Sequence, residues 1–123
     1  MHMRSRTTLI LILLTSVILA CTDKKHQEFI IGHWTGVDWK VENQPSQYSA
    51  GDASFTFDAN GNYSFDYAGS GEKGIYSISN NQLFTTPEGG IKMMVKVITL
   101  TPDTLILDMN RGGQAEQITL VKK

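Results

Sequence analysis

The chain has 123 residues, of which 41% are hydrophobic and 19% charged, and its formal net charge at pH 7 is -1. This length and this composition are ordinary for one globular domain. Lysine and arginine residues are scattered along the sequence, so they form no basic cluster of the kind that binds a phosphate backbone. Composition and charge therefore argue against a nucleic-acid-binding protein.

The first 20 residues differ in composition from the rest of the chain. Arg4 and Arg6 precede an uncharged apolar stretch that is interrupted by Thr15 and Ser16. A positively charged start followed by a short apolar run is typical of a secretory signal peptide. A membrane-spanning helix needs about 20 consecutive apolar residues, and this run is shorter. We therefore expect residues 1–20 to be a signal peptide that is removed on export.

The only cysteine of the chain, Cys21, follows this segment directly. The four residues Ile18-Leu19-Ala20-Cys21 resemble the lipobox of bacterial lipoprotein signal peptides, in which the cysteine becomes the first mature residue and bears the lipid. The resemblance implies a lipid-anchored protein of the bacterial cell envelope, with acyl chains such as palmitate on Cys21. The alternative is an ordinary secretory signal followed by a free thiol. A single cysteine allows no disulfide within the domain in either case.

The residues after Cys21 are polar and charged, and we expect a flexible tether over residues 21–28 and a folded domain over residues 29–123. In lipoproteins of enteric-type bacteria, an aspartate directly after the cysteine retains the protein at the inner membrane. Here that position is Thr22, and Asp23 comes one residue later. The resemblance to lipoproteins therefore favours the outer membrane.

Beyond the tether, strand signals are frequent and helix signals are almost absent. Short runs rich in β-branched and aromatic residues alternate with turn residues, which predicts an antiparallel all-β domain, either a sandwich or an up-and-down barrel. The eight expected strands are residues 33–41, 52–58, 62–68, 74–79, 82–86, 91–100, 104–109 and 115–121.

The turns between these strands predict which residues face each other, because residues opposite in an antiparallel pair share a face of the sheet. A three-residue loop with left-handed Gly61 and a two-residue Asn80-Asn81 turn define two hairpins. Their expected pairs are Phe57 with Tyr63, Phe55 with Phe65, Ile78 with Leu83, and Tyr76 with Thr85. A loop at residues 101–104 and a Gly113-Gln114 turn define two more. Their expected pairs are Leu100 with Leu105, Ile98 with Leu107, Met109 with Ile118, and Leu107 with Leu120.

Two segments stand apart from this regular pattern. The connection from Glu42 to Gly51 is the only long one, which makes it the candidate for a lid or binding loop. The run 91–100 is apolar on both faces apart from Lys92 and Lys96. The candidates for covering its outer face are the tether, a neighbouring strand and a partner.

The first expected strand opens with Gly32-His33-Trp34. This Gly-x-Trp resembles the motif that opens the first strand of lipocalins and of the short lipocalin-like domains of bacterial lipoproteins. Later segments resemble the same family in the same order: FTFDANGNYSF, GIYSISNNQLF, and VITLTPDTLIL followed by ITLVKK. The resemblance implies a small eight-stranded antiparallel up-and-down β-barrel.

The same resemblance implies how the two ends of the barrel are built. Trp34 would plug the closed end beside Gly32, and the Glu42–Gly51 loop would border the open end. A basic residue on the last strand would pack over the tryptophan. Lys122 is the candidate for this role, with Lys123 and Arg111 as competitors.

Aromatic residues are the candidates for binding a ligand, because several share one face of the predicted sheet. The alternative is that they form an ordinary core. Trp39 has opposite parity to Trp34 unless Gly36 forms a β-bulge. The candidate ligand-binding residues are Trp39, Tyr48, Phe55, Phe57, Tyr63, Phe65, Tyr67 and Tyr76.

Residues suited to catalysis are scarce in the predicted domain. It contains one histidine, His33, and no cysteine beyond Cys21, so zinc sites and Cys/His nucleophile pairs lack residues. Acidic residues, Glu72 among them, are expected at strand ends and turns, where carboxylates cap backbone groups. We expect no enzyme activity, no catalytic residue, no metal and no cofactor.

These observations favour two hypotheses about function. The first is a membrane-tethered lipocalin-like lipoprotein that binds a small apolar or amphipathic molecule in the barrel mouth. The alternative is a lipoprotein that binds an envelope protein, as an inhibitor or assembly factor, with a barrel filled by side chains. An open cavity is needed for the first, and an exposed apolar patch for the second.

Overall fold

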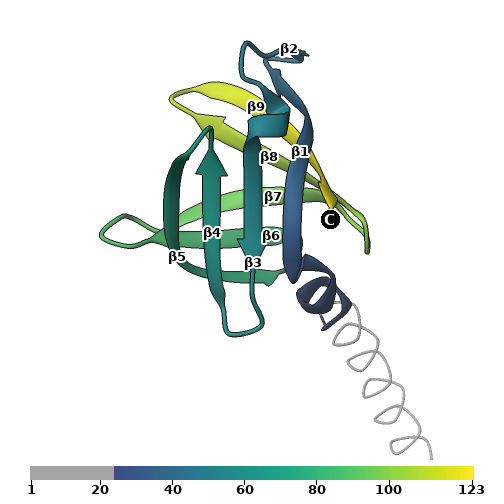
Figure 1. Cartoon of the computed structure of the whole chain (residues 1–123), viewed down its shortest axis with the longest axis vertical. Coiled ribbons are helices and arrows are strands. Elements are labelled where there is room, and N and C mark those ends of the chain that lie inside the picture. Colours follow the sequence, from purple (N-terminus) through teal and green to yellow (C-terminus); the bar gives the residue numbers. More distant parts are fainter. Residues whose placement is uncertain (1–23) are drawn as a thin grey trace, which may run out of the picture.

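The computed structural model describes residues 24–123, which form a closed antiparallel β-barrel (Figure 1). The strands are β1 (Gly32–Val41), β2 (Gln44–Pro45), β3 (Ala53–Phe57), β4 (Asn62–Tyr67), β5 (Ser70–Ser79), β6 (Gln82–Pro87), β7 (Met93–Leu100), β8 (Thr104–Arg111) and β9 (Gln114–Lys122). They follow the order β2-β1-β3-β4-β5-β6-β7-β8-β9, and pairing of β1 with β9 closes the barrel. The expected eight-stranded up-and-down barrel is confirmed, with the two-residue β2 as an addition at the rim.

The eight long strands coincide with the eight expected ones, and the largest difference lies at the start of β5. This strand begins at Ser70 because Ala68 and Gly69 form a tight turn, with φ of 51° and 88°, that pairs Tyr67 with Ser70. Positive φ at both central residues matches the twist of a two-residue hairpin. The segment 70–74 contains no β-branched or aromatic residue, which is why the sequence pattern does not mark it as a strand.

The registers expected for the first two hairpins are confirmed. Phe57 lies opposite Tyr63 and Phe55 opposite Phe65, with Gly61 at φ 86° in the connecting loop. Ile78 lies opposite Leu83 across a turn in which Asn80 and Asn81 both have positive φ. The expected pairs Tyr76–Thr85 and Leu100–Leu105 are also present.

The expected pairing of Ile98 with Leu107 is wrong. Val97 lies opposite Leu107, and the register shifts between Val97 and Thr99. A β-bulge inserts one residue into one strand only. The extra residue here is Ile98, which lies 44% exposed on the outside of the barrel.

The expected register of the last hairpin is also wrong, by two residues. The turn consists of Gly112 and Gly113, with φ of 59° and 86°, so Arg111 pairs with Gln114. Two left-handed residues in succession are adopted most easily by glycine, and Gln114 lacks that freedom. Consequently Met109 lies opposite Glu116, not Ile118, and Leu107 opposite Ile118, not Leu120. A shift of two preserves the face of every residue, so the predicted inward set is unaffected.

A second bulge in β1 decides where Trp39 points. The register between β1 and β9 shifts between Gly36 and Asp38, and Val37 is 55% exposed. The bulge brings Trp39 to the inside of the barrel, where it is 6% exposed. At this point the backbone of β1 approaches the 3-10 helix η1 (Ala50–Asp52) so closely that a Cβ on Gly36 would lie 2.2 Å from the Ala50 carbonyl oxygen.

Residues 24–30 are helical, which differs from the flexible tether that the sequence predicts up to residue 28. The last turn of this helix is held by the barrel. The Trp34 indole Nε1 donates to the Ile30 carbonyl at 2.8 Å, and Lys122 Nζ donates to the Phe29 carbonyl at 2.7 Å. These donors satisfy carbonyl groups that a helix C-terminus leaves without partners. None of the helices in the described residues 24–123 is long and apolar enough to cross a membrane.

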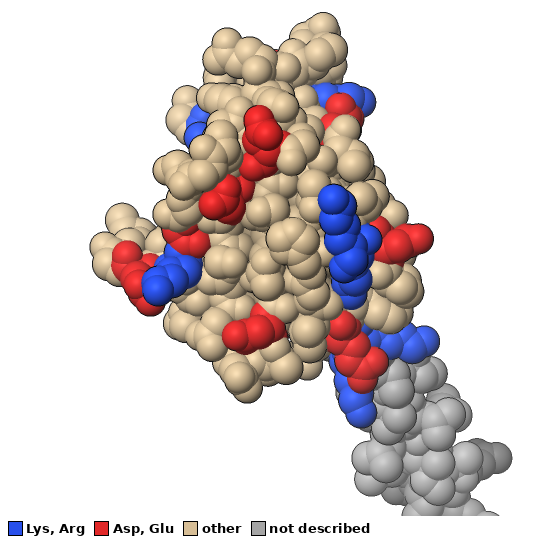
Figure 2. Space-filling model, viewed as in Figure 1, with Lys and Arg blue, Asp and Glu red and all other residues tan. Residues whose placement is uncertain are grey.

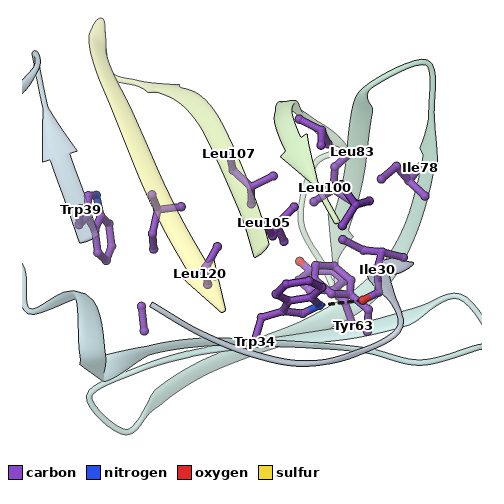
Figure 3. Close-up of a cluster of buried hydrophobic side chains, with 14 residues drawn as sticks. Ile30, Trp34, Trp39, Tyr63, Ile78, Leu83, Leu100, Leu105, Leu107 and Leu120 are labelled. Atoms are coloured by element: carbon purple, nitrogen blue, oxygen red, sulfur yellow. Dashed lines mark hydrogen bonds between the residues drawn. The ribbon is translucent and has the colours of Figure 1, made fainter. Parts of the chain in front are cut away.

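The hydrophobic core lies inside the barrel, with Ile30 and Trp34 at the end next to this helix and Trp39 apart from them (Figure 3). Ile30, Trp34, Leu105, Ile118 and Leu120 are 0% exposed. Residues 24–123 contain a complete core and a sheet that closes on itself, so this part of the chain constitutes one folding unit.

We predict that Gly36→Ala destabilises the domain, because the added Cβ would overlap the Ala50 carbonyl oxygen. The expected decrease in the free energy of unfolding is about 1–3 kcal/mol, and urea denaturation would measure it. Gly51→Ala is the matched control, since a Cβ there would meet no atom within 4 Å. Equal stability of the two variants would show that the backbone approach at Gly36 imposes no constraint.

Candidate ligand-binding site

The barrel contains a cavity of about 260 Å³ whose wall includes no residue of the residue 24–30 helix. Inward-facing residues of all eight long strands form its wall. They are Trp39, Phe55, Tyr63, Phe65, Glu72, Leu83, Thr85, Met93, Val95, Leu107, Met109, Arg111 and Ile118. The interior is therefore solid toward the closed end and hollow toward the open end.

The aromatic part of this wall comes from the β3–β4 hairpin. The rings of Phe55 and Phe65 lie 4.6 Å apart between centroids, and Phe55 stacks on Phe57 at 5.6 Å. Their register is fixed by the Gly61 loop, which places aromatic residues opposite each other on one face. Packed rings of this kind form a rigid apolar surface.

A second aromatic cluster lies at the rim, beside Trp39. Tyr48 stacks on Trp39 with centroids 4.9 Å apart, and Tyr67 meets the same indole edge-on at 5.7 Å. Two hydrogen bonds from backbone N–H groups hold the Glu42–Gly51 connection against this cluster: Ser46 N–H donates to the Trp39 carbonyl, and Ser49 N–H donates to the Tyr67 side-chain hydroxyl. The candidate lid loop thus supplies Tyr48 to the rim of the cavity.

Two pairs of polar side chains belong to the cavity and its rim. The Tyr63 hydroxyl donates to Glu72 Oε2 at 2.6 Å. Burial, and secondly the hydrogen bond to Glu72, raise the pKa of Tyr63, so this hydroxyl remains a donor at neutral pH. Arg111 Nε lies 3.3 Å from Glu116 Oε2, and the Trp39 indole donates to Glu116 Oε1 at 3.0 Å.

The sequence pattern does not mark these polar residues as ligand-binding residues. Glu72, expected at a turn, lies on β5 opposite Phe65 and lines the cavity. Glu116 is two residues before buried Ile118, and Arg111 two residues after inward Met109. Strand alternation would have placed both inside the barrel.

The eight candidate ligand-binding residues fall into three places. Trp39, Phe55, Tyr63 and Phe65 line the cavity, whereas Tyr48 and Tyr67 form the rim cluster with Trp39. Phe57 is 1% exposed and lies in the core. Tyr76 packs edge-on against Phe57 at 4.9 Å and donates its hydroxyl to the Asp58 carbonyl, which stabilises the β3–β4 loop.

The three residues proposed to close the barrel lie together at the other end. Lys122 Nζ is 5.0 Å from the centroid of the Trp34 ring, a cation–π distance. Gly32 has φ 139°, and a Cβ there would lie 3.1 Å from Lys122 Cε. Arg111, a competitor for the role of Lys122, lies at the opposite end of the barrel beside Glu116.

His33 takes no part in the cavity. Its Nδ1 shares a hydrogen bond with the Thr56 hydroxyl at 2.9 Å on the exposed side of the sheet. Within residues 24–123, no group of three or more His, Cys, Asp or Glu side chains is placed to hold a metal ion.

The closed barrel and its tryptophan plug agree with the comparison with known families. A model of the lipocalin-like domain matches residues 30–107, more than half of the chain. The chain belongs to the lipocalin-like domain family. The match runs from the last helical residue before β1 into β8, and so includes Trp34 and most of the cavity wall.

Two crystal structures resemble this lipocalin-like domain. A lipocalin-like protein from Bacteroides uniformis ATCC 8492 is 16% identical, with a TM-score of 0.60 over 77% of this chain and 99% of that chain. An uncharacterized protein from Bacteroides eggerthii DSM 20697 is also 16% identical, with a TM-score of 0.55 over 76% of this chain and 98% of that chain. At this identity the similarity shows the fold alone. No curated protein matches the chain.

We predict that Lys122→Ala lowers the free energy of unfolding by about 1–2 kcal/mol, because it removes the cation over Trp34 and the hydrogen bond to Phe29. Lys123→Ala is the matched control, since the Lys123 side chain is exposed and should contribute less than about 0.5 kcal/mol. Urea denaturation followed by tryptophan fluorescence measures both. Equal effects of the two substitutions would refute a specific role for Lys122.

Proposed function

We propose that this lipocalin-like domain binds a small apolar or amphipathic molecule in the cavity at the open end of the barrel. The observation that supports this is a 260 Å³ space whose wall is mostly apolar and contains a few convergent polar groups. Ligand sites in proteins are concave and mainly apolar, with volumes of roughly 300–1,000 Å³. The cavity lies just below that range, so it suits a compact ligand, or the apolar end of one that extends past the rim.

Burial of the cavity wall would supply the free energy of binding. Phe55, Phe65 and Val95 are only half-buried, and Met93 is 52% exposed. Covering such apolar surface is favourable by roughly 25 cal/mol per Å². The wall is preformed by the sheet, so little ordering is needed on binding.

The second part of the proposal is that a lipid on Cys21 tethers the domain to the membrane, with the outer membrane favoured by Thr22 after the cysteine. The residue 24–30 helix leaves the barrel at its closed end, whereas β2 marks the open end (Figure 1). Since Cys21 precedes Lys24 by three residues, their Cα atoms are at most about 11 Å apart. A lipid on Cys21 would therefore hold the closed end near the membrane and leave the mouth facing away.

Surface charge gives no alternative means of attachment on the face drawn in Figure 2. Acidic and basic side chains are interspersed there, and they do not gather into one basic area. Attraction to anionic lipid needs a cluster of lysine or arginine residues.

We predict that Cys21→Ser prevents attachment to the membrane. The chain with its own first 20 residues would be produced in a lipoprotein-processing bacterium supplied with labelled palmitate. The unmodified chain should incorporate label and sediment with membranes, and the variant should do neither, because its hydroxyl cannot replace the thiol. An unlabelled, soluble unmodified chain would refute the tether without affecting the cavity proposal.

A specific observation supports the alternative of protein binding. The outer face of the barrel exposes Ile75, Met94 and Ile98, at 60%, 52% and 44%. The residue 24–30 helix packs at the closed end and leaves these three side chains exposed. The hollow upper half of the barrel, however, departs from the filled interior that this alternative assumes.

Neighbouring residues of β7 distinguish the two functions. Val95 faces the cavity, whereas Met94 faces the outside of the barrel. We predict that Val95→Gln weakens binding of the neutral apolar probe N-phenyl-1-naphthylamine at least tenfold. The reason is that the added amide would lack hydrogen-bond partners in the apolar wall. Met94→Gln should leave the affinity unchanged. Fluorescence titration of residues 24–123 measures both.

The two remaining outcomes of this titration are also informative. Saturable binding that both substitutions weaken equally would place the probe outside the cavity. No saturable binding by a folded domain would refute the ligand-binding proposal and favour a protein partner on the outer face.

A further inference from the structure

The charged groups of the cavity do not balance one another, and this restricts the class of ligand. Glu116 is 5% exposed, and a buried carboxylate needs a counter-charge. Arg111 supplies it, with Nε 3.3 Å from Glu116 Oε2. The single basic residue of the cavity wall is therefore already paired.

Glu72 is the charge that remains. Among the described residues, its hydrogen-bond partner is a neutral group, the Tyr63 hydroxyl, which donates to Oε2 at 2.6 Å. Neither of the two ion pairs in residues 24–123 includes Glu72. Its neighbour Lys73 points to the opposite face of β5, since side chains alternate along a strand. The cavity and its paired Glu116 thus contain two carboxylates and one guanidinium, a net charge of -1.

The surroundings of Glu72 suit a cation. Phe65 lies directly opposite Glu72 in the β4–β5 pair, and Phe55 packs against Phe65. The faces of aromatic rings attract cations, and a carboxylate attracts them more strongly. A ligand carboxylate would instead be repelled by Glu72, the carboxylate that has no cationic partner within residues 24–123.

The position of Glu72 along β5 keeps the cost of binding a cation low. Pairing of β5 with β6 begins only at Gly74, opposite Pro87, so Glu72 lies beyond the end of that ladder and is exposed at the rim. A cation bound there remains partly hydrated and avoids most of the desolvation penalty of a buried ion.

Resting on the function proposed above, we infer that the ligand is an amphipathic amine. Its ammonium group pairs with Glu72 at the rim, and its apolar portion lies deeper, against Phe55, Phe65 and Val95. The cavity discriminates against fatty-acid carboxylates of the same length.

The test is displacement of N-phenyl-1-naphthylamine from residues 24–123 at pH 7 by three matched straight-chain molecules, octylamine, octanol and octanoate. We expect octylamine to bind at least tenfold more tightly than octanoate, with octanol between them. Glu72→Gln should remove the preference for octylamine over octanol. Glu88→Gln is the matched control, because it removes the same charge from an exposed residue outside the cavity wall, and it should preserve the order.

Reversing the charge at Glu72 tests the inference by a gain of octanoate binding, where Glu72→Gln tests it by a loss of preference. Glu72→Lys should bind octanoate more tightly than octylamine, and thermal unfolding shows that each variant is folded. Binding of the neutral probe with no preference for octylamine, or a preference that Glu72→Gln leaves intact, would overturn the amine inference while the proposed function stands. Failure of the unmodified domain to bind the probe at all would overturn both.

Discussion

Closure of the sheet by β1 is the constraint on which the rest of this structure depends. β1 pairs with β3 through Gly32 to Thr35 and with β9 from Trp34 onward, so one strand joins both edges of the meander. Changing partners along its length requires a bend, which the bulge at Val37 and the absence of a side chain at Gly36 provide. The bend turns the Trp39 side chain inward. Without the bend, Trp39 would not pack against Tyr48 and Tyr67 at the rim.

Trp34 and Trp39 lie at opposite ends of the barrel interior. Trp34 is packed under the helix that ends at Ile30 and under Lys122, which makes the closed end solid. Trp39 is held at the open end by Glu116 and by Tyr48. The side chains between them on β6 to β9 are mostly aliphatic and do not fill the upper half, so a cavity remains there. One β-bulge thus separates a tryptophan packed in the closed end from one that lines the cavity at the open end.

The polar groups of the mouth illustrate how a small barrel accommodates charge. Glu116 is buried but satisfied from two sides, by an indole and a guanidinium, and so contributes to the order of the rim. Glu72 is bound to a hydroxyl only and lies where solvent or a ligand can reach it. The first carboxylate is thus balanced by a charged partner within the barrel, whereas within residues 24–123 the second is not.

The sequence by itself determined the eight strands, their antiparallel order and the inward faces of the first hairpins, because alternation and turn chemistry are local properties. Tertiary structure alone decided the bulges at Val37 and Ile98, which arise when strands from distant parts of the chain must close a barrel. It also decided the environments of Glu72, Arg111 and Glu116. Their contacts join side chains on paired strands, so they depend on the register of those strands. Alternation places such residues inside, but only the closed barrel shows that Glu116 is paired with Arg111 and that Glu72 is bonded to a neutral hydroxyl.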